Sequence, residues 1–164
     1  MRRHRELTVI TAALVMLAGC GQDSNVQILE NIPEVEPANA TSKDFGDYVL
    51  YFNAMTTDQL EPEVARAYNI VRSNRRAMVS ISIIKKEPDT IGGSVTGSID
   101  VKAVNLTGQQ KNLSIRKIQD GDAIYYIGDV PVASGEKLVY DINVTPVNET
   151  KEMSVRFSHQ FFAD

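Results

Sequence analysis

Apolar and polar residues alternate along most of the chain after residue 44. The clearest case runs from Val95 to Ala103, where every second residue is apolar or glycine and the residues between them are polar. A period of two is typical of a β-strand with one buried face. This pattern, or an apolar run of similar length, predicts seven strands, at residues 45–52, 77–84, 95–103, 113–119, 123–130, 138–145 and 153–161. The first, Phe45 to Phe52, is apolar on both faces, so we expect a buried central strand there.

Turn residues separate these segments. Asp120-Gly121-Asp122 joins two of them directly and predicts a hairpin. Seven short strands at regular spacing favour an all-β fold, a two-sheet antiparallel sandwich of immunoglobulin-like layout, with an open barrel as the alternative. The chain has no tryptophan and one cysteine, so the core tryptophan and disulfide of antibody domains are absent.

One segment departs from the β pattern. Pro62 suits the first position of a helix, the flanking acids suit its positive start, and Asn69 suits its end. Val64 and Tyr68 lie four residues apart and would share one face. The sequence therefore predicts about two turns of helix over Pro62–Tyr68.

The first nineteen residues have the pattern of an export signal. A basic start (Arg2, Arg3, Arg5) precedes an apolar stretch that is too short to span a bilayer permanently. The stretch runs into Leu17-Ala18-Gly19-Cys20, which resembles the bacterial lipobox. We expect residues 1–19 to be removed and Cys20 to carry the lipid. An ordinary signal peptide with a chance cysteine, or a signal anchor, is the alternative.

The residues after Cys20 bear on location and organisation. Gly21 stands where an aspartate would favour the inner membrane in enterobacteria-like lipoproteins, so the resemblance implies an outer-membrane anchor that faces the periplasm. Residues 20–43 are polar, acidic and contain prolines, which predicts a flexible tether. Val26 to Leu29 forming a short docked strand is the alternative. The β-sandwich domain is expected over residues 44–164.

Charge is unevenly distributed along the chain. The formal net charge is −4, which argues against nucleic-acid binding. From Val64 to Lys86, however, there are six basic residues and no acid. Four of them, together with one tyrosine that the strand pattern places on the surface, are candidate partner-binding residues: Arg66, Arg72, Arg75, Arg76 and Tyr125. They would bind an anionic envelope component or an acidic protein. The alternative is a solvated segment whose arginines pair with acids elsewhere in the fold.

Several segments resemble the family catalogued as domain of unknown function 4426 (DUF4426), found in exported proteobacterial proteins. They are Phe45-Gly46-Asp47-Tyr48, Asn53-Ala54, Pro62 to Tyr68 with Arg72-Ser73, Asn105-Leu106 with Gly108-Gln109, Gly121 to Tyr126, and Phe157 to Phe162. The resemblance covers roughly Asp44 to Asp164. It supports the β-sandwich and an exported location, and it brings no activity.

The sequence offers little for catalysis or metal binding. After residue 19 the only histidine is His159, which lies in the apolar register of the last predicted strand. One histidine and no free thiol cannot form a zinc site, and no serine lies in a Gly-x-Ser-x-Gly turn. We therefore expect no metal, no cofactor and no enzyme activity.

The leading hypothesis is a membrane-tethered, non-catalytic binding or accessory module. The alternatives are an envelope enzyme that acts on glycans through carboxylates, and a purely structural envelope protein.

Overall fold

The computed structural model describes residues 33–163. The predicted signal peptide, Cys20 and the first part of the predicted tether lie outside the described residues. Within the described range no helix is both long enough and apolar enough to cross a membrane.

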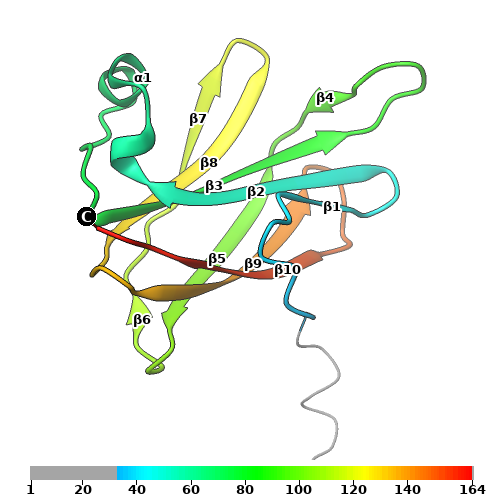
Figure 1. Ribbon diagram of the computed structural model, residues 1–164. Helices are drawn as coiled ribbons and strands as arrows, with labels where there is room; N and C mark the ends of the chain where they lie inside the picture. The colour runs from blue at the N-terminus through cyan, green and yellow to red at the C-terminus, as the bar shows by residue number, and fades with distance from the viewer. Residues whose placement is uncertain (1–32, 164) are drawn as a thin grey trace, which may run out of the picture. The chain divides into compact units, whose positions relative to one another are not determined.

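Two antiparallel sheets form the domain, and the larger lies above the smaller in Figure 1. The larger sheet has the order β1-β2-β3-β8-β7, with β4 paired to β3; the smaller has the order β10-β9-β5-β6. The strands of the larger sheet are β1 (Ser42–Asp44), β2 (Tyr48–Thr56), β3 (Arg76–Lys85), β4 (Gly93–Ser94), β7 (Arg116–Asp120) and β8 (Ala123–Pro131). Those of the smaller sheet are β5 (Gly97–Asn105), β6 (Gln110–Lys111), β9 (Lys137–Pro146) and β10 (Met153–Gln160).

The strand order identifies the kind of sandwich. Among residues 33–163, seven strands have five or more residues: β2, β3, β5, β7, β8, β9 and β10. In chain order, the first, second, fifth and fourth of them form one sheet, and the third, sixth and seventh form the other. This is the order of an immunoglobulin constant-type domain. The predicted sandwich is confirmed, and the open-barrel alternative is wrong.

The alternating segments became strands with the expected faces. The strand predicted at 113–119 is shorter than expected and is observed as β7, from Arg116 to Asp120. Asp120-Gly121-Asp122 does join β7 to β8 as a hairpin. The prediction for Phe45–Phe52 was wrong in part. The strand begins at Tyr48, runs to Thr56, and alternates between buried and more exposed residues. Val49, Tyr51 and Met55, the apolar residues on its second face, lie outside the main core.

The main core lies between the sheets. It contains twenty buried residues, with an aromatic row at its centre. The Phe157 ring lies 4.9 Å from that of Phe52 and 5.0 Å from that of Tyr140, between centroids. The row therefore joins β2 of one sheet to β9 and β10 of the other.

The predicted helix is confirmed. A 3-10 turn, η1 (Thr57–Gln59), precedes α1 (Pro62–Ala67), in which Pro62 is at the start. Asn69 has a φ of +52°, the left-handed conformation that asparagine tolerates better than most residues just after a helix. The sequence signals for start and end thus operate as expected.

Residues 33–44, which we call the N-terminal strap, lie along one side of the sandwich. Val35 pairs in parallel with Arg156 of β10, and β1 pairs with β2. An ion pair of 2.6 Å between Lys43 and Glu36 links the two halves. The part of the predicted tether within the described residues is thus attached to both sheets. Its pairing is with residues distant in the chain, so local composition does not reveal it.

Candidate functional site

The outer face of the larger sheet, which points away from the main core, carries a second group of apolar side chains. Met78 of β3, Ile118 of β7 and Ile127 of β8 are buried there. Four partly buried residues pack against them: Met55, Leu60, Tyr68 and Ile70. Three of these belong to the segment around α1, so this segment covers one part of the sheet face.

A pocket of about 250 Å³ remains between α1 and the sheet, and we call it the α1 pocket. Its lining is mainly apolar and comes from the α1 segment and from β3, β7 and β8. The lining residues are Leu60, Val64, Tyr68, Ile70, Met78, Ser80, Ile118, Asp120, Tyr125 and Ile127. An apolar pocket with few polar groups is the usual form of a binding site.

A second hollow of about 210 Å³ continues from the first across the sheet face. Tyr51, Asn53 and Ser82 contribute to it, and it shares Ser80 and Tyr125 with the α1 pocket. The two hollows together are called the sheet-face groove. The Tyr125 side of the surface, one of the predicted contact regions, therefore lies at the centre of the groove.

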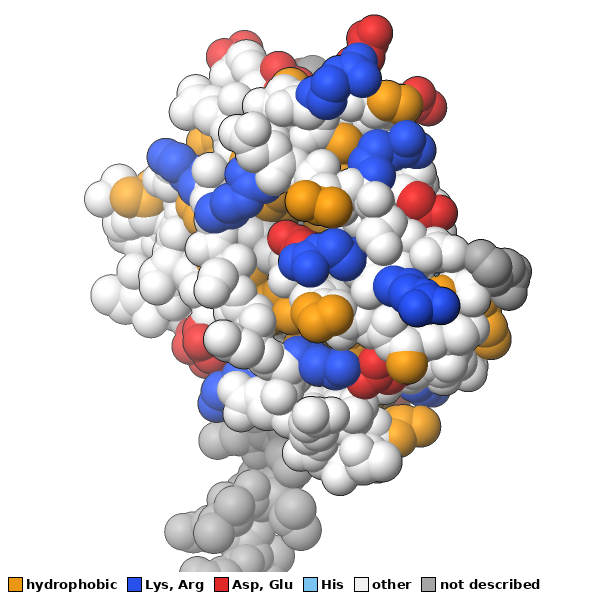
Figure 2. Space-filling model, turned by 90° about the vertical axis from the view of Figure 1, so that its left-hand side faces the viewer, with side chains coloured by type: hydrophobic (Ala, Val, Ile, Leu, Met, Phe, Trp, Pro, Cys, Tyr) orange, Lys and Arg blue, Asp and Glu red, His pale blue; other side chains and the backbone are white. Residues whose placement is uncertain are grey.

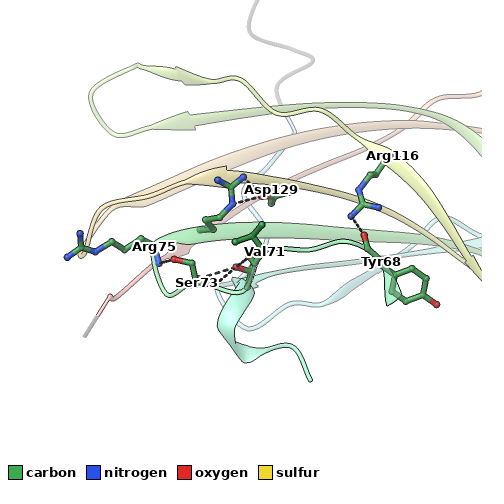
Figure 3. A network of polar contacts seen from close by, with 8 residues as sticks. Tyr68, Val71, Ser73, Arg75, Arg116 and Asp129 are labelled. Carbon is green, nitrogen blue, oxygen red and sulfur yellow. Dashed lines mark hydrogen bonds and ion pairs between the residues drawn. The ribbon is translucent and has the colours of Figure 1, made fainter. Parts of the chain in front are cut away.

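Hydrogen bonds hold the segment that follows α1 in place (Figure 3). The hydroxyl of buried Thr57 donates to the Val71 carbonyl at 2.8 Å and accepts from the Ser73 N–H at 2.9 Å. From β7, Arg116 donates to the carbonyl of Tyr68 at 2.6 Å. These bonds hold residues 68–73, and Tyr68 and Ile70 of this segment form part of the wall of the α1 pocket.

The groove is nearly uncharged. Asp120 is the only charged residue among those that line its two hollows. Burial of the Tyr68 ring and the negative charge of nearby Asp120 raise the pKa of the Tyr68 phenol. The phenol therefore stays neutral and can donate a hydrogen bond.

The predicted basic residues differ in what their side chains contact. Arg76 is ion-paired with Asp129 of β8, at 2.7 Å from its Nε, and Arg72 donates to the Asp58 carbonyl at 2.5 Å. These two arginines stabilise the fold locally. Lys85 and Lys86 lie at the other end of β3 from Arg76, about 30 Å away.

Within residues 33–163, the side chains of the other two predicted arginines are free. Arg66 on α1 and Arg75 are exposed, and no side-chain hydrogen bond or ion pair holds either of them within residues 33–163. Arg75 points away from the network in Figure 3 and lines a separate, open polar hollow near the ion pair of Lys111 and Glu136. On the face that Figure 2 shows, basic side chains are separated by acidic and apolar ones.

Two candidates for chemistry remain, namely His159 and a metal site. His159 is half-buried on β10, with its ring 4.7 Å from that of Phe161, and burial lowers the pKa of its imidazole. No group of three or more His, Cys, Asp or Glu side chains in the described part of the chain could hold a metal ion.

Comparisons with known proteins agree with this architecture. The family model for a domain of unknown function, DUF4426, matches residues 42–164. The structure is similar to that of a DUF4426 family protein from Pseudomonas aeruginosa PAO1, with 28% identity and a TM-score of 0.65 over 75% of this chain and 94% of that one. It is also similar to FetP of uropathogenic E. coli strain F11, at 11% identity and a TM-score of 0.53 over 80% and 95% of the two chains, which shows a shared fold alone. No curated protein matches.

Proposed function

Since this chain belongs to the DUF4426 family, a domain of unknown function, we propose a role for it from the geometry of its surface. We propose that the protein is an envelope lipoprotein, anchored through Cys20 in the outer membrane and facing the periplasm. Its sandwich is a non-catalytic binding module that holds its partner in the sheet-face groove.

The observation that carries this proposal is the group of exposed apolar side chains around the groove. Tyr51 is 47% exposed, and Tyr125 and Val64 are each 41% exposed. Scattered apolar residues are normal on a protein surface, but here they surround a preformed hollow. Tyrosines in such positions bury a large area on binding and keep a hydroxyl for hydrogen bonding.

The lining of the groove favours binding over glycan hydrolysis. Hydrolysis of a glycosidic bond usually needs two carboxyl groups that face each other across the substrate, about 5–10 Å apart. In the described part of the chain, Asp120 is the only acid that lines the groove. A site with one carboxylate and many apolar side chains is suited to hold a partner.

A photo-crosslinking residue placed at Tyr125 in living cells tests this proposal. We expect a specific adduct from position 125 and none from Lys102, an exposed position on the other sheet. Val64→Lys should abolish the adduct, because it places a charged chain at the mouth of the α1 pocket. Equal labelling from positions 125 and 102 would refute a partner in the groove. So would an adduct at position 125 whose yield is unchanged by Val64→Lys.

A further inference from the structure

Resting on the proposed function, we infer that the partner is an extended peptide segment. It adds as a strand to the free edge of β7 and inserts one apolar side chain into the α1 pocket. The inference rests on three features that meet at β7: an unpaired edge, an apolar pocket beside it, and a charge difference along it.

The edge of β7 is open along its whole length, whereas the longer strands β2, β10 and β5 each have part of an edge covered. β1 covers β2, Val35 of the strap pairs with β10, and β6 covers the end of β5. β7 pairs with β8 on one side, and no other strand among residues 33–163 pairs with its second side. Its backbone N–H and C=O groups on that side can therefore bind an added strand.

The α1 pocket lies where an added strand would need it. β7 contributes Ile118 and Asp120 to the pocket, and the α1 segment contributes the opposite wall. An added strand would lie about 4.8 Å from β7, with alternate side chains on the outer face of the sheet. One of these side chains would reach the pocket, which is the arrangement by which edge-binding domains combine backbone affinity with side-chain specificity.

Charge selects the kind of peptide. Arg116 and Lys117 lie at the start of β7, and Asp120 lies at its end, about 13 Å away. A lysine on an edge strand also prevents unselective pairing between sheets. Successive side chains of a strand point to opposite faces, so Arg116 lies on the face of the α1 pocket and Lys117 on the other. The best occupant therefore carries an acid beside one of these two residues, an apolar residue at the α1 pocket, and no acid beside Asp120. A lipid chain would use the pocket but not the unpaired amides.

The test uses the full chain and a phage-displayed library of seven-residue peptides. Selected peptides are synthesised, and their dissociation constants are measured by calorimetry. We expect Val64→Gln to weaken binding about tenfold or more and Lys117→Glu to weaken it for acidic peptides. Val71→Gln is the matched control, since Val71 is 69% exposed and does not line the groove.

N-methylation of the peptide gives a readout that is specific for strand addition. Because alternate amides of an added strand face β7, methylating every second amide should weaken binding about tenfold, and methylating those between should do much less. If methylation at either set of amides weakens binding equally, the inference of strand addition is wrong.

Other outcomes separate the two proposals. If no library peptide binds above background while position 125 still gives its adduct, the peptide inference is wrong and the groove binds another kind of partner. If peptides bind equally well to Val64→Gln and wild type, the α1 pocket is not their site. Absence of a specific adduct at Tyr125 refutes the proposed function itself.

Discussion

At the scale of single residues, two core tyrosines differ in what their hydroxyl groups contact. The Tyr126 hydroxyl accepts from the N–H of Gly97 at 2.9 Å and lies 3.1 Å from the Gly97 carbonyl, to which it donates. It therefore links β8 of one sheet to β5 of the other. The Tyr140 hydroxyl is buried without a hydrogen-bond partner among the described residues, and burial raises the pKa of this phenol.

Removing each hydroxyl should have opposite consequences. Tyr126→Phe should lower the free energy of unfolding by about 1–2 kcal/mol, because it removes the partner of two partly buried backbone groups of Gly97. Tyr140→Phe should leave stability unchanged or raise it, because an unsatisfied buried hydroxyl disappears. Urea denaturation of both variants checks this, and equal losses would contradict the difference in bonding.

His159 should make stability depend on pH. Burial lowers the pKa of its imidazole below the unfolded value of about 6.5, so the unfolded chain binds the proton more readily. The stabilisation that His159 gives the folded state is therefore fully present above the unfolded pKa. It is lost progressively as the pH falls from the unfolded pKa to the lower pKa of the folded state.

Denaturation curves from pH 8 to pH 5 test this dependence. Wild type should lose stability below about pH 6.5, and His159→Gln should lose less over the same interval. Parallel curves for the two proteins would show that other groups cause the change.

At the scale of elements, the sequence was most informative where the interactions are local. Pro62 and Asn69 marked the ends of α1, and Asp120-Gly121-Asp122 marked the β7–β8 turn. The short strands β1, β4 and β6 were not predicted, because two or three residues carry no measurable period. The strap was missed because its partners lie in β2 and β10, far away in the chain.

Removal of the strap should destabilise the sandwich. A chain that starts at residue 33 should fold, whereas one that starts at residue 45 loses the cover of β2 and β10. We expect the shorter chain to melt roughly 5–10 °C lower and to self-associate through its open edges. Thermal melts and light scattering measure both effects; identical behaviour of the two chains would show that the strap adds nothing.

At the scale of the whole molecule, the candidate site was predicted only in part. Alternation in β8 correctly placed Tyr126 inside and Tyr125 outside. The basic run in the sequence is divided in the structure, because β3 carries Arg76 and Lys85 to opposite ends and Asp129 pairs with Arg76. Met78 and Ile118 gave no signal of a groove, since only the packing of α1 over the sheet creates it.

Attachment to the membrane is a prediction for the whole molecule. Cys20→Ala should block acylation and remove the protein from the membrane fraction, while the sandwich stays folded. Labelling with a radioactive fatty acid and fractionation of cells measure this. A labelled, membrane-bound Cys20→Ala protein would show that the anchor lies elsewhere.

The N-terminal strap also determines how the molecule would respond to force. Any pull applied through the N-terminal side of the chain reaches the strap before it reaches the core. The first bonds to carry the tension are that from the Glu36 N–H to the Arg156 carbonyl and the short ladder between β1 and β2. Their rupture would open two sheet edges while the buried aromatic row stays intact. Tension on the N-terminal side of the chain would thus convert the domain into a form that can pair with other strands, before it unfolds.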